Sequence, residues 1–145
     1  MRLLSVFLLL LLAPWPHPAD AEPANITVTD AWIRAVPGSD VAAAYFIIHN
    51  NGSRAATVIG VRTPAAGSAM IHETSLSGTR STMRPREQLP LTPGRTVRLA
   101  PGGTHVMLMN LQHPLIPGER VALLLLLEGG ASIPVTARVR ALGEE

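Results

Sequence analysis

Turn-forming residues interrupt this chain at short, regular intervals, and this spacing limits what it can fold into. The 145 residues include 13 prolines and 12 glycines. Between them, no segment keeps a convincing helical period of apolar residues. The apolar, alternating or β-branched segments that remain lie at residues 26–33, 42–49, 56–61, 70–74, 96–99, 104–109, 121–127 and 133–139. Seven to nine short strands are therefore expected, in an all-β antiparallel sandwich or small barrel.

The tripeptide Asn50-Asn51-Gly52 ends the second of these segments and predicts a hairpin-type turn. Asn and Gly both tolerate a positive φ, so we expect Asn51 and Gly52 to serve the turn.

The first 21 residues indicate a secretory signal rather than a part of the fold. Arg2 supplies a positive charge, and the apolar run at residues 3–13 is shorter than the roughly 20 residues of a transmembrane helix. Breaking prolines follow, and Ala19-Asp20-Ala21 matches a small-x-small cleavage pattern. We expect a cleaved signal at residues 1–21, a mature chain that begins at Glu22, and export from the cytoplasm.

The mature chain, residues 22–145, has the length of one domain. It has no second long apolar run, so no membrane span is expected in it. Over all 145 residues, the 12 basic residues are all arginine, nearly balance the 10 acidic ones and are scattered, which argues against nucleic-acid binding. The chain has no cysteine, so disulfides cannot hold the fold and core packing must do so.

Soft metal donors are concentrated between residues 70 and 113. This span holds every methionine except the initiator and three of the five histidines. They are Met70, Met83, Met107, Met109, His72, His105 and His113.

The alternation of side chains along residues 104–109 places three of these donors on one face of the predicted strand. Side chains of a strand point to opposite faces in turn, so His105, Met107 and Met109 share one face. Val106 and Leu108 then point to the other face and are expected in the core. A metal site needs donors that converge from one face, and the His-x-Met spacing provides two neighbouring donors.

A second pair of donors repeats the two-residue spacing in Met70-Ile71-His72, with Ile71 facing the opposite way. Met83 follows the turn at Gly78 and is placed to close the site from a loop or strand.

The donor types select the metal. Thioether sulfur is soft and uncharged, and it favours copper(I) over zinc, calcium or magnesium. Imidazole adds a borderline donor without adding negative charge. A thiolate would bind copper(I) more tightly but forms disulfides in an oxidising compartment. Methionine and histidine avoid this problem and allow looser, transferable binding, as a carrier requires.

Structural roles for some of these residues stay open at this stage. Methionines in apolar strands often fill gaps in a core, which leaves Met70 and Met109 undecided. His113, beside Pro114, is more consistent with a surface residue, and His49 precedes a turn and is expected to be structural.

The spacing of four donors resembles that of a known family. His72, Met83, His105 and Met107 reproduce the pattern H-x10-M-x21-H-x-M, and the segments 31–34, 43–46, 72–74, 83–85 and 101–109 agree with it. The mature chain is similar along nearly its whole length to the periplasmic copper chaperone family PCuAC. This resemblance implies a cupredoxin-like Greek-key β-sandwich that binds one Cu(I) through His72, Met83, His105 and Met107.

The resemblance also implies a periplasmic role without catalysis. Such proteins are associated with delivering copper toward the copper centres of cytochrome c oxidase, alongside Sco-type proteins. The acceptor expected here is therefore a Sco-type protein or a copper-centre subunit of the oxidase. Arg80, Arg84 and Arg86 are near the site in sequence and are candidates for a docking rim, while Trp32 is expected in the core or as a shield of the copper.

The alternatives to a dedicated chaperone fall into three classes: a copper buffer, an enzyme or electron-transfer protein, and a metal-free module. A copper buffer or scavenger would need the same site. A blue-copper protein would need a cysteine, and a histidine-brace oxygenase would need an N-terminal histidine, whereas the mature chain is expected to start at Glu22. No Ser/His/Asp spacing or carboxylate pair suggests a hydrolase. A metal-free β-sandwich for adhesion or interaction would leave the His/Met spacing as coincidence.

Overall fold

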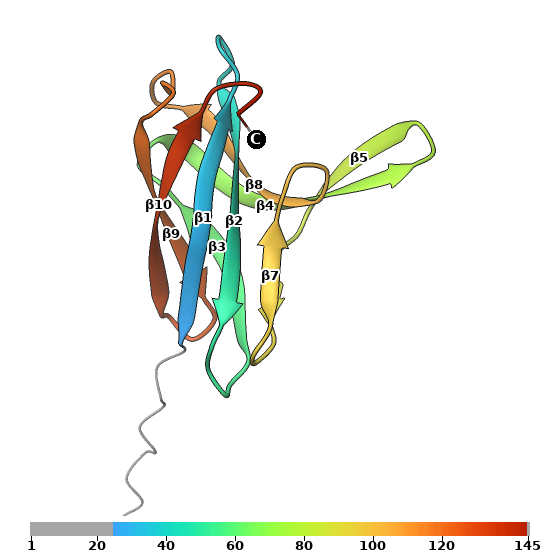
Figure 1. Cartoon of the computed structure of the whole chain (residues 1–145), viewed down its shortest axis with the longest axis vertical. Helices are drawn as coiled ribbons and strands as arrows, with labels where there is room; N and C mark the ends of the chain where they lie inside the picture. Colours follow the sequence, from blue (N-terminus) through green and yellow to red (C-terminus); the bar gives the residue numbers. More distant parts are fainter. Residues whose placement is uncertain (1–24, 145) are drawn as a thin grey trace, which may run out of the picture.

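A computed structural model describes residues 25–144, which form ten strands and no helix (Figure 1). The all-β expectation is confirmed, and no helix able to cross a membrane occurs in this part of the chain. The predicted signal at residues 1–21 and the start at Glu22 lie outside the described residues. The strands are β1 (Ile26–Ala35), β2 (Val41–Asn50), β3 (Ala56–Arg62), β4 (Ala66–Ser77), β5 (Arg80–Pro85), β6 (Leu89–Leu91), β7 (Thr96–Leu99), β8 (Thr104–Leu111), β9 (Arg120–Leu127) and β10 (Ser132–Arg140).

The strands form a β-sandwich. They are hydrogen-bonded in the order β5-β4-β8-β2-β1-β10-β9-β3-β6. The first half of β2 pairs with β8 and its second half pairs with β7. The side of the molecule that carries β1, β2 and β8 packs against β3 and β9 (Figure 1). Neighbouring strands are antiparallel as predicted, except that β1 and β10 are parallel.

Alternation along the strands divides each of them between a core face and an outer face. Val106 and Leu108 of β8 are fully buried in the core, as predicted, together with Phe46 of β2 and Leu125 of β9. Ile71 of β4 is likewise buried in the core cluster. The outer face of β4, β8 and β2 is therefore left for the histidines and methionines.

A β-bulge in β1 changes which side chains face outward. The register with β2 shifts between Thr29 and Trp32, and Asp30 there has a positive φ of 52°. Beyond the bulge, Ile33 enters the core, whereas Trp32 pairs with Tyr45 on the outer face. Trp32 is buried, as expected, although it lies on this outer face and outside the main core cluster.

The turn after β2 is not a hairpin. β3 pairs with β6 and β9 rather than with β2, so the chain crosses here to another part of the sheet. Asn50 is 98% buried and its amide nitrogen donates to the carbonyls of Arg54 and Leu91, at 2.8 and 2.9 Å. Its oxygen accepts from the Gly52 amide at 3.0 Å. Among the described residues, positive φ occurs neither at Asn51 nor at Gly52, so the predicted turn chemistry is also wrong.

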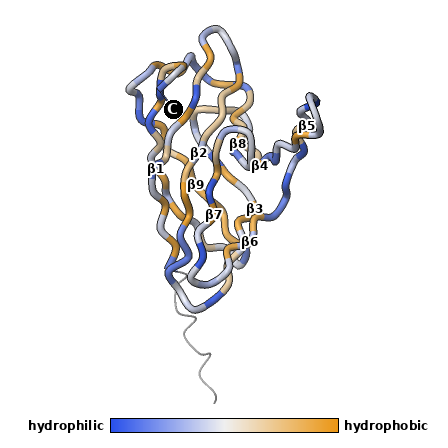
Figure 2. The backbone as a smooth tube through the Cα atoms, turned by 45° about the vertical axis from the view of Figure 1, so that its right-hand side comes forward, coloured by the Kyte–Doolittle hydropathy of each residue, from blue (hydrophilic) through white to orange (hydrophobic). Residues whose placement is uncertain are grey.

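An arm formed by β4 and β5 projects from the sandwich (Figure 1). β4 continues past the end of its pairing with β8 at Glu73, and among the described strands it is paired from there with β5 alone. All six residues of β5 are exposed. The hydrophobic segments lie mainly in the strands of the body, while the tip of the arm is hydrophilic (Figure 2). The arm is therefore held by backbone pairing rather than by a core of its own.

Candidate metal centre

Two histidines form the middle of the candidate site. His72 of β4 and His105 of β8 are directly opposite each other in the antiparallel pair, on its outer face. Their ring centroids are 5.9 Å apart. The side chains are only 9% and 4% exposed, which is unusual for histidines on the outer face of a sheet.

A backbone carbonyl sets the tautomer of His105. Its Nδ1 is 3.1 Å from the oxygen of Gly103. A carbonyl oxygen can only accept, so Nδ1 carries the proton and donates it. The same carbonyl accepts from the Thr74 amide at 3.2 Å and so links the residue before β8 to β4. The lone pair of the neutral ring is therefore on Nε2, the arrangement found for metal-binding histidines whose other nitrogen is hydrogen-bonded.

His72 carries a buried nitrogen without a partner. Its Nδ1 is inaccessible to solvent and makes no hydrogen bond to the described residues. Such a group costs free energy unless something pairs with it. Burial, with a smaller contribution from nearby His105, lowers the pKa of His72 below its usual value near 6.5. The ring is thus held neutral, which is the form that binds a metal.

Met107 lies beside the histidine pair. It is two residues along β8 from His105, on the same face, and its cross-strand partner in β4 is Met70. Cross-strand partners have Cβ atoms about 5 Å apart, and diagonal neighbours about 7–8 Å. His72, His105, Met70 and Met107 are therefore a two-by-two block of neighbouring side chains on one face.

Met83 approaches the site from the arm. The prediction that it follows the Gly78 turn is confirmed: it lies on β5, opposite Thr74 of β4. This makes it a diagonal neighbour of His72, but β4 separates it from His105. Its side chain is 56% exposed. Of the four predicted ligands, the structure brings His72, His105 and Met107 together and places Met83 at the edge of the group.

Aromatic rings cover the other side of His105. The ring of Tyr45 on β2 is 6.3 Å from that of His105, and the ring of Trp32 on β1 is 4.6 Å from that of Tyr45. The guanidinium of Arg34 lies 5.5 Å from the Tyr45 ring, and that of Arg140 lies 4.8 Å from the Trp32 ring. These distances are within the range of cation–π contacts. A row of rings thus leads from the arginines to the histidine pair.

The remaining candidate residues lie elsewhere. Met109 shares the face of Met107 but is one pair farther from the histidines, opposite Ser68. His113 follows β8, where Nδ1 donates to the Pro114 carbonyl and Nε2 is 3.7 Å from a Glu119 oxygen. The ring of His49 is hydrogen-bonded to the hydroxyls of Thr29 and Thr96, which supports its predicted structural role.

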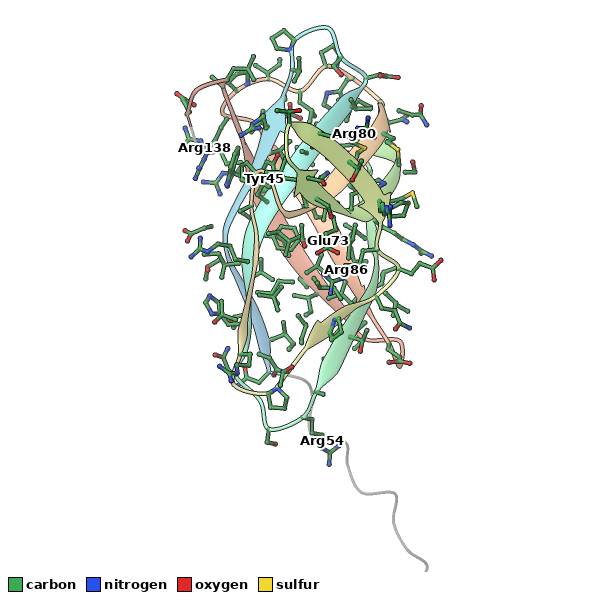
Figure 3. All side chains as sticks on the ribbon, turned by 90° about the vertical axis from the view of Figure 1, so that its right-hand side faces the viewer. Tyr45, Arg54, Glu73, Arg80, Arg86 and Arg138 are labelled. Atoms are coloured by element: carbon green, nitrogen blue, oxygen red, sulfur yellow. The ribbon has the colours of Figure 1, made fainter. Side chains whose placement is uncertain are left out.

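The site contains no arrangement that suits a hard cation. Among residues 25–144, no group of three or more His, Cys, Asp or Glu side chains is placed to hold a metal. Glu73, the acidic residue next to His72 in the chain, is 3.7 Å from Arg86 in an ion pair (Figure 3). Two imidazoles flanked by thioethers fit a soft ion such as copper(I).

Comparisons with known proteins identify the family. The model of the family described as "Putative lipoprotein LpqE-like" matches residues 26–139, which is most of the chain. The chain belongs to the LpqE-like family. A curated relative, "Putative lipoprotein Lxx21020" of Leifsonia xyli subsp. xyli, is 35% identical over 117 residues, covering 80% of this chain and 70% of the relative.

Solved structures similar to this LpqE-like chain include copper-binding domains. The copper-bound PCuAC domain from PmoF2 is 26% identical with a TM-score of 0.68, covering 80% of this chain and 92% of that domain. The copper(I) form of DR1885 from Deinococcus radiodurans is 32% identical with a TM-score of 0.58, covering 84% and 81%. The apo PCuAC domain from PmoF1 is 28% identical with a TM-score of 0.67, covering 80% and 93%. The cupredoxin-like sandwich expected from the sequence is thereby confirmed.

The structure of this LpqE-like chain adds Tyr45 to the neighbourhood of the site and places Met70, which the sequence left undecided, within it. Tyr45 lies beside His105, and Met70 lies opposite Met107. Neither position follows from spacing along the chain, because both depend on which residues are paired between strands. The alternation of β4 gave one signal for Met70, namely that it shares a face with His72.

Proposed function

We propose that this LpqE-like chain is an exported, non-enzymatic carrier that binds one copper(I) through His72, Met83, His105 and Met107. The observation that carries the proposal is the buried histidine pair next to Met107. One ring presents Nε2 as its lone-pair nitrogen, and the other has a buried Nδ1 without a partner. The likeness to a copper-bound PCuAC domain and to copper(I)-bound DR1885 supports it.

The donor set suits a carrier rather than a permanent copper centre. All four side chains are neutral, so binding of copper(I) requires no deprotonation of a thiol and leaves a single positive charge on the site. The thioether on the exposed arm is accessible to an incoming acceptor. Tyr45 and Trp32 cover the inner flank of the histidines, so exchange of ligands is favoured from the side of Met83.

The carrier is proposed to act in the periplasm and to deliver copper(I) to an acceptor for assembly of the copper centres of cytochrome c oxidase. A Sco-type protein or a copper-centre subunit of the oxidase is the proposed acceptor. Arg80 and Arg84 on the exposed arm remain candidates for its docking rim, whereas Arg86 is engaged with Glu73.

A competition titration tests the proposed binding. The purified protein is titrated with copper(I) in the presence of a chromogenic copper(I) chelator, and a His105→Asn/Met107→Leu variant is compared with it. The wild type should retain one equivalent. The variant should keep its far-ultraviolet circular dichroism and lose at least about tenfold in affinity, since even the partners of metal ligands contribute about 10- to 100-fold. A wild type that yields all its copper to the weakest chelator would overturn the proposal.

A further inference from the structure

Met70 lies closer to the histidine pair and Met107 than Met83 does. Met70 is the direct cross-strand partner of Met107 and is two residues from His72 on the same face. Met83 is separated from β8 by β4, and two strand spacings amount to roughly 10 Å. In the conformation described, the compact group of donors is therefore His72, His105, Met107 and Met70.

The environment of Met70 is not that of a core residue. Its side chain is 43% exposed, and it is absent from the hydrophobic core cluster that contains its neighbour Ile71. A methionine that fills a gap in a core would be enclosed by apolar side chains. An exposed thioether next to buried imidazoles is instead available to a ligand on this face.

Space beside Met70 allows its thioether to move. A hollow of about 190 Å3 lies along the free edge of β4, where Met70 and Pro85 line it together with Ile59 of β3. β5 pairs with β4 only from His72 onward, and the Ile71 carbonyl accepts from the Arg86 amide at 2.8 Å, so it is only before Ile71 that the edge has no strand partner among the described residues. Methionine has three rotatable bonds, so its sulfur can reach a metal from several rotamers.

We propose that Met70 is a fifth copper(I) ligand, which exchanges with Met83 during loading and release. The inference rests on the proposed function, since it concerns the same copper(I) site. With the arm in the conformation described, copper(I) is held by His72, His105, Met107 and Met70. As the arm bends toward the face, the bond from copper to the Met83 sulfur forms and the bond to the Met70 sulfur breaks. Both donors are neutral thioethers, so no proton or electron is transferred and copper stays in its +1 state.

The exchange has a consequence for release. Copper(I) does not leave the two imidazoles and Met107 when an acceptor removes Met83, because Met70 takes its place. Loss of Met83 alone should therefore weaken binding without abolishing it, and loss of both methionines should do far more.

The test uses leucine substitutions, which keep the volume of methionine and cost little stability. Copper(I) affinity is measured by chelator competition for the wild type, Met83→Leu, Met83→Leu/Met70→Leu and the matched control Met83→Leu/Met109→Leu. Met109 is also on this face but one pair farther away. We expect the Met70 double variant to bind at least about tenfold more weakly than Met83→Leu, and the Met109 double variant to match Met83→Leu.

A second measurement detects directly whether the Met70 side chain binds copper(I). In Met83→Leu labelled with carbon-13 at the methionine methyl groups, one equivalent of copper(I) should shift the Met70 and Met107 signals and leave that of Met109 in place. Equal affinities of Met83→Leu and Met83→Leu/Met70→Leu, or an unmoved Met70 signal, would overturn this inference alone. A wild type that binds no copper(I) would overturn both the inference and the proposed function.

Discussion

His72 and His105 are paired directly across β4 and β8, with their ring centroids 5.9 Å apart and their planes inclined by 31°. The burial of both rings limits their protonation. Two imidazoles cannot both be protonated at this distance in a desolvated site without a large electrostatic cost. The two rings are therefore not both protonated, and burial lowers the pKa of His72 in particular.

The tautomer of His105 is the first prediction. Because Nδ1 donates to the Gly103 carbonyl, His105 should exist as the Nδ1–H tautomer in the metal-free protein. Long-range proton–nitrogen correlation spectra should show Nδ1 as the protonated nitrogen. Addition of copper(I) should then shift the Nε2 resonance. A copper-dependent shift confined to Nδ1 would contradict the geometry described.

The stability of the metal-free protein should depend on the charge of His72. Its pKa is lowered in the folded state, so the unfolded chain binds the proton more tightly. The free energy of unfolding should thus be highest above the unfolded pKa near 6.5 and decrease as the pH falls through it toward the lowered folded value. Urea denaturation at several values between about pH 5 and pH 8 measures this slope. His72→Asn should flatten the slope, and an unchanged slope would show that His72 is not its source.

Asn50 is predicted to stabilise the crossing between β2 and β3. Asn50→Ala removes three hydrogen bonds and leaves the buried carbonyl of Leu91 without its donor. The free energy of unfolding should fall by about 1–3 kcal/mol or more. Asn51→Ala is the matched control, since its exposed side chain makes one bond, to Thr27, and should cost no more than about 0.5 kcal/mol. Equal losses in the two variants would argue against this role.

Like charges are paired across β9 and β10. Arg120 is directly opposite Arg138, and both are exposed (Figure 3 labels Arg138). Opposite-charge pairs contribute roughly 0.2–1 kcal/mol, so Arg120→Glu should raise the free energy of unfolding by about this amount at low salt. The gain should shrink as salt screens the pair. Arg54→Glu, at the distant end of the molecule in Figure 3, should show no such gain, and a gain of equal size there would indicate an effect of net charge only.

The sequence predicted the parts of the site that depend on local alternation. Along residues 104–109 the chain has period two without interruption, so the faces of His105, Val106 and Met107 could be assigned. The same holds for Met70, Ile71 and His72. The existence of β5 and β6 was not predicted, because one is fully exposed and the other has only three residues, so neither has a recognisable apolar pattern.

The sequence did not predict which residues are paired between strands that are far apart in the chain. The bulge at Asp30 reverses the alternation of β1, which is why Trp32 is buried beside Tyr45 on the outer face while Ile33 enters the main core cluster. Similarly, the Asn50 turn looked like a hairpin because the residues suit one, yet β3 finds its partners in β6 and β9. Such choices are made by tertiary packing and not by the turn residues themselves.

X-ray absorption at the copper K-edge of the protein loaded with one equivalent of copper(I) tests the central claim most directly. The chain contains no cysteine, so any sulfur around the metal must come from methionine. We predict a first shell that contains both sulfur and imidazole nitrogen. The sulfur contribution should decrease in Met107→Leu while copper remains in the +1 state. A first shell of nitrogen and oxygen without sulfur would contradict the account.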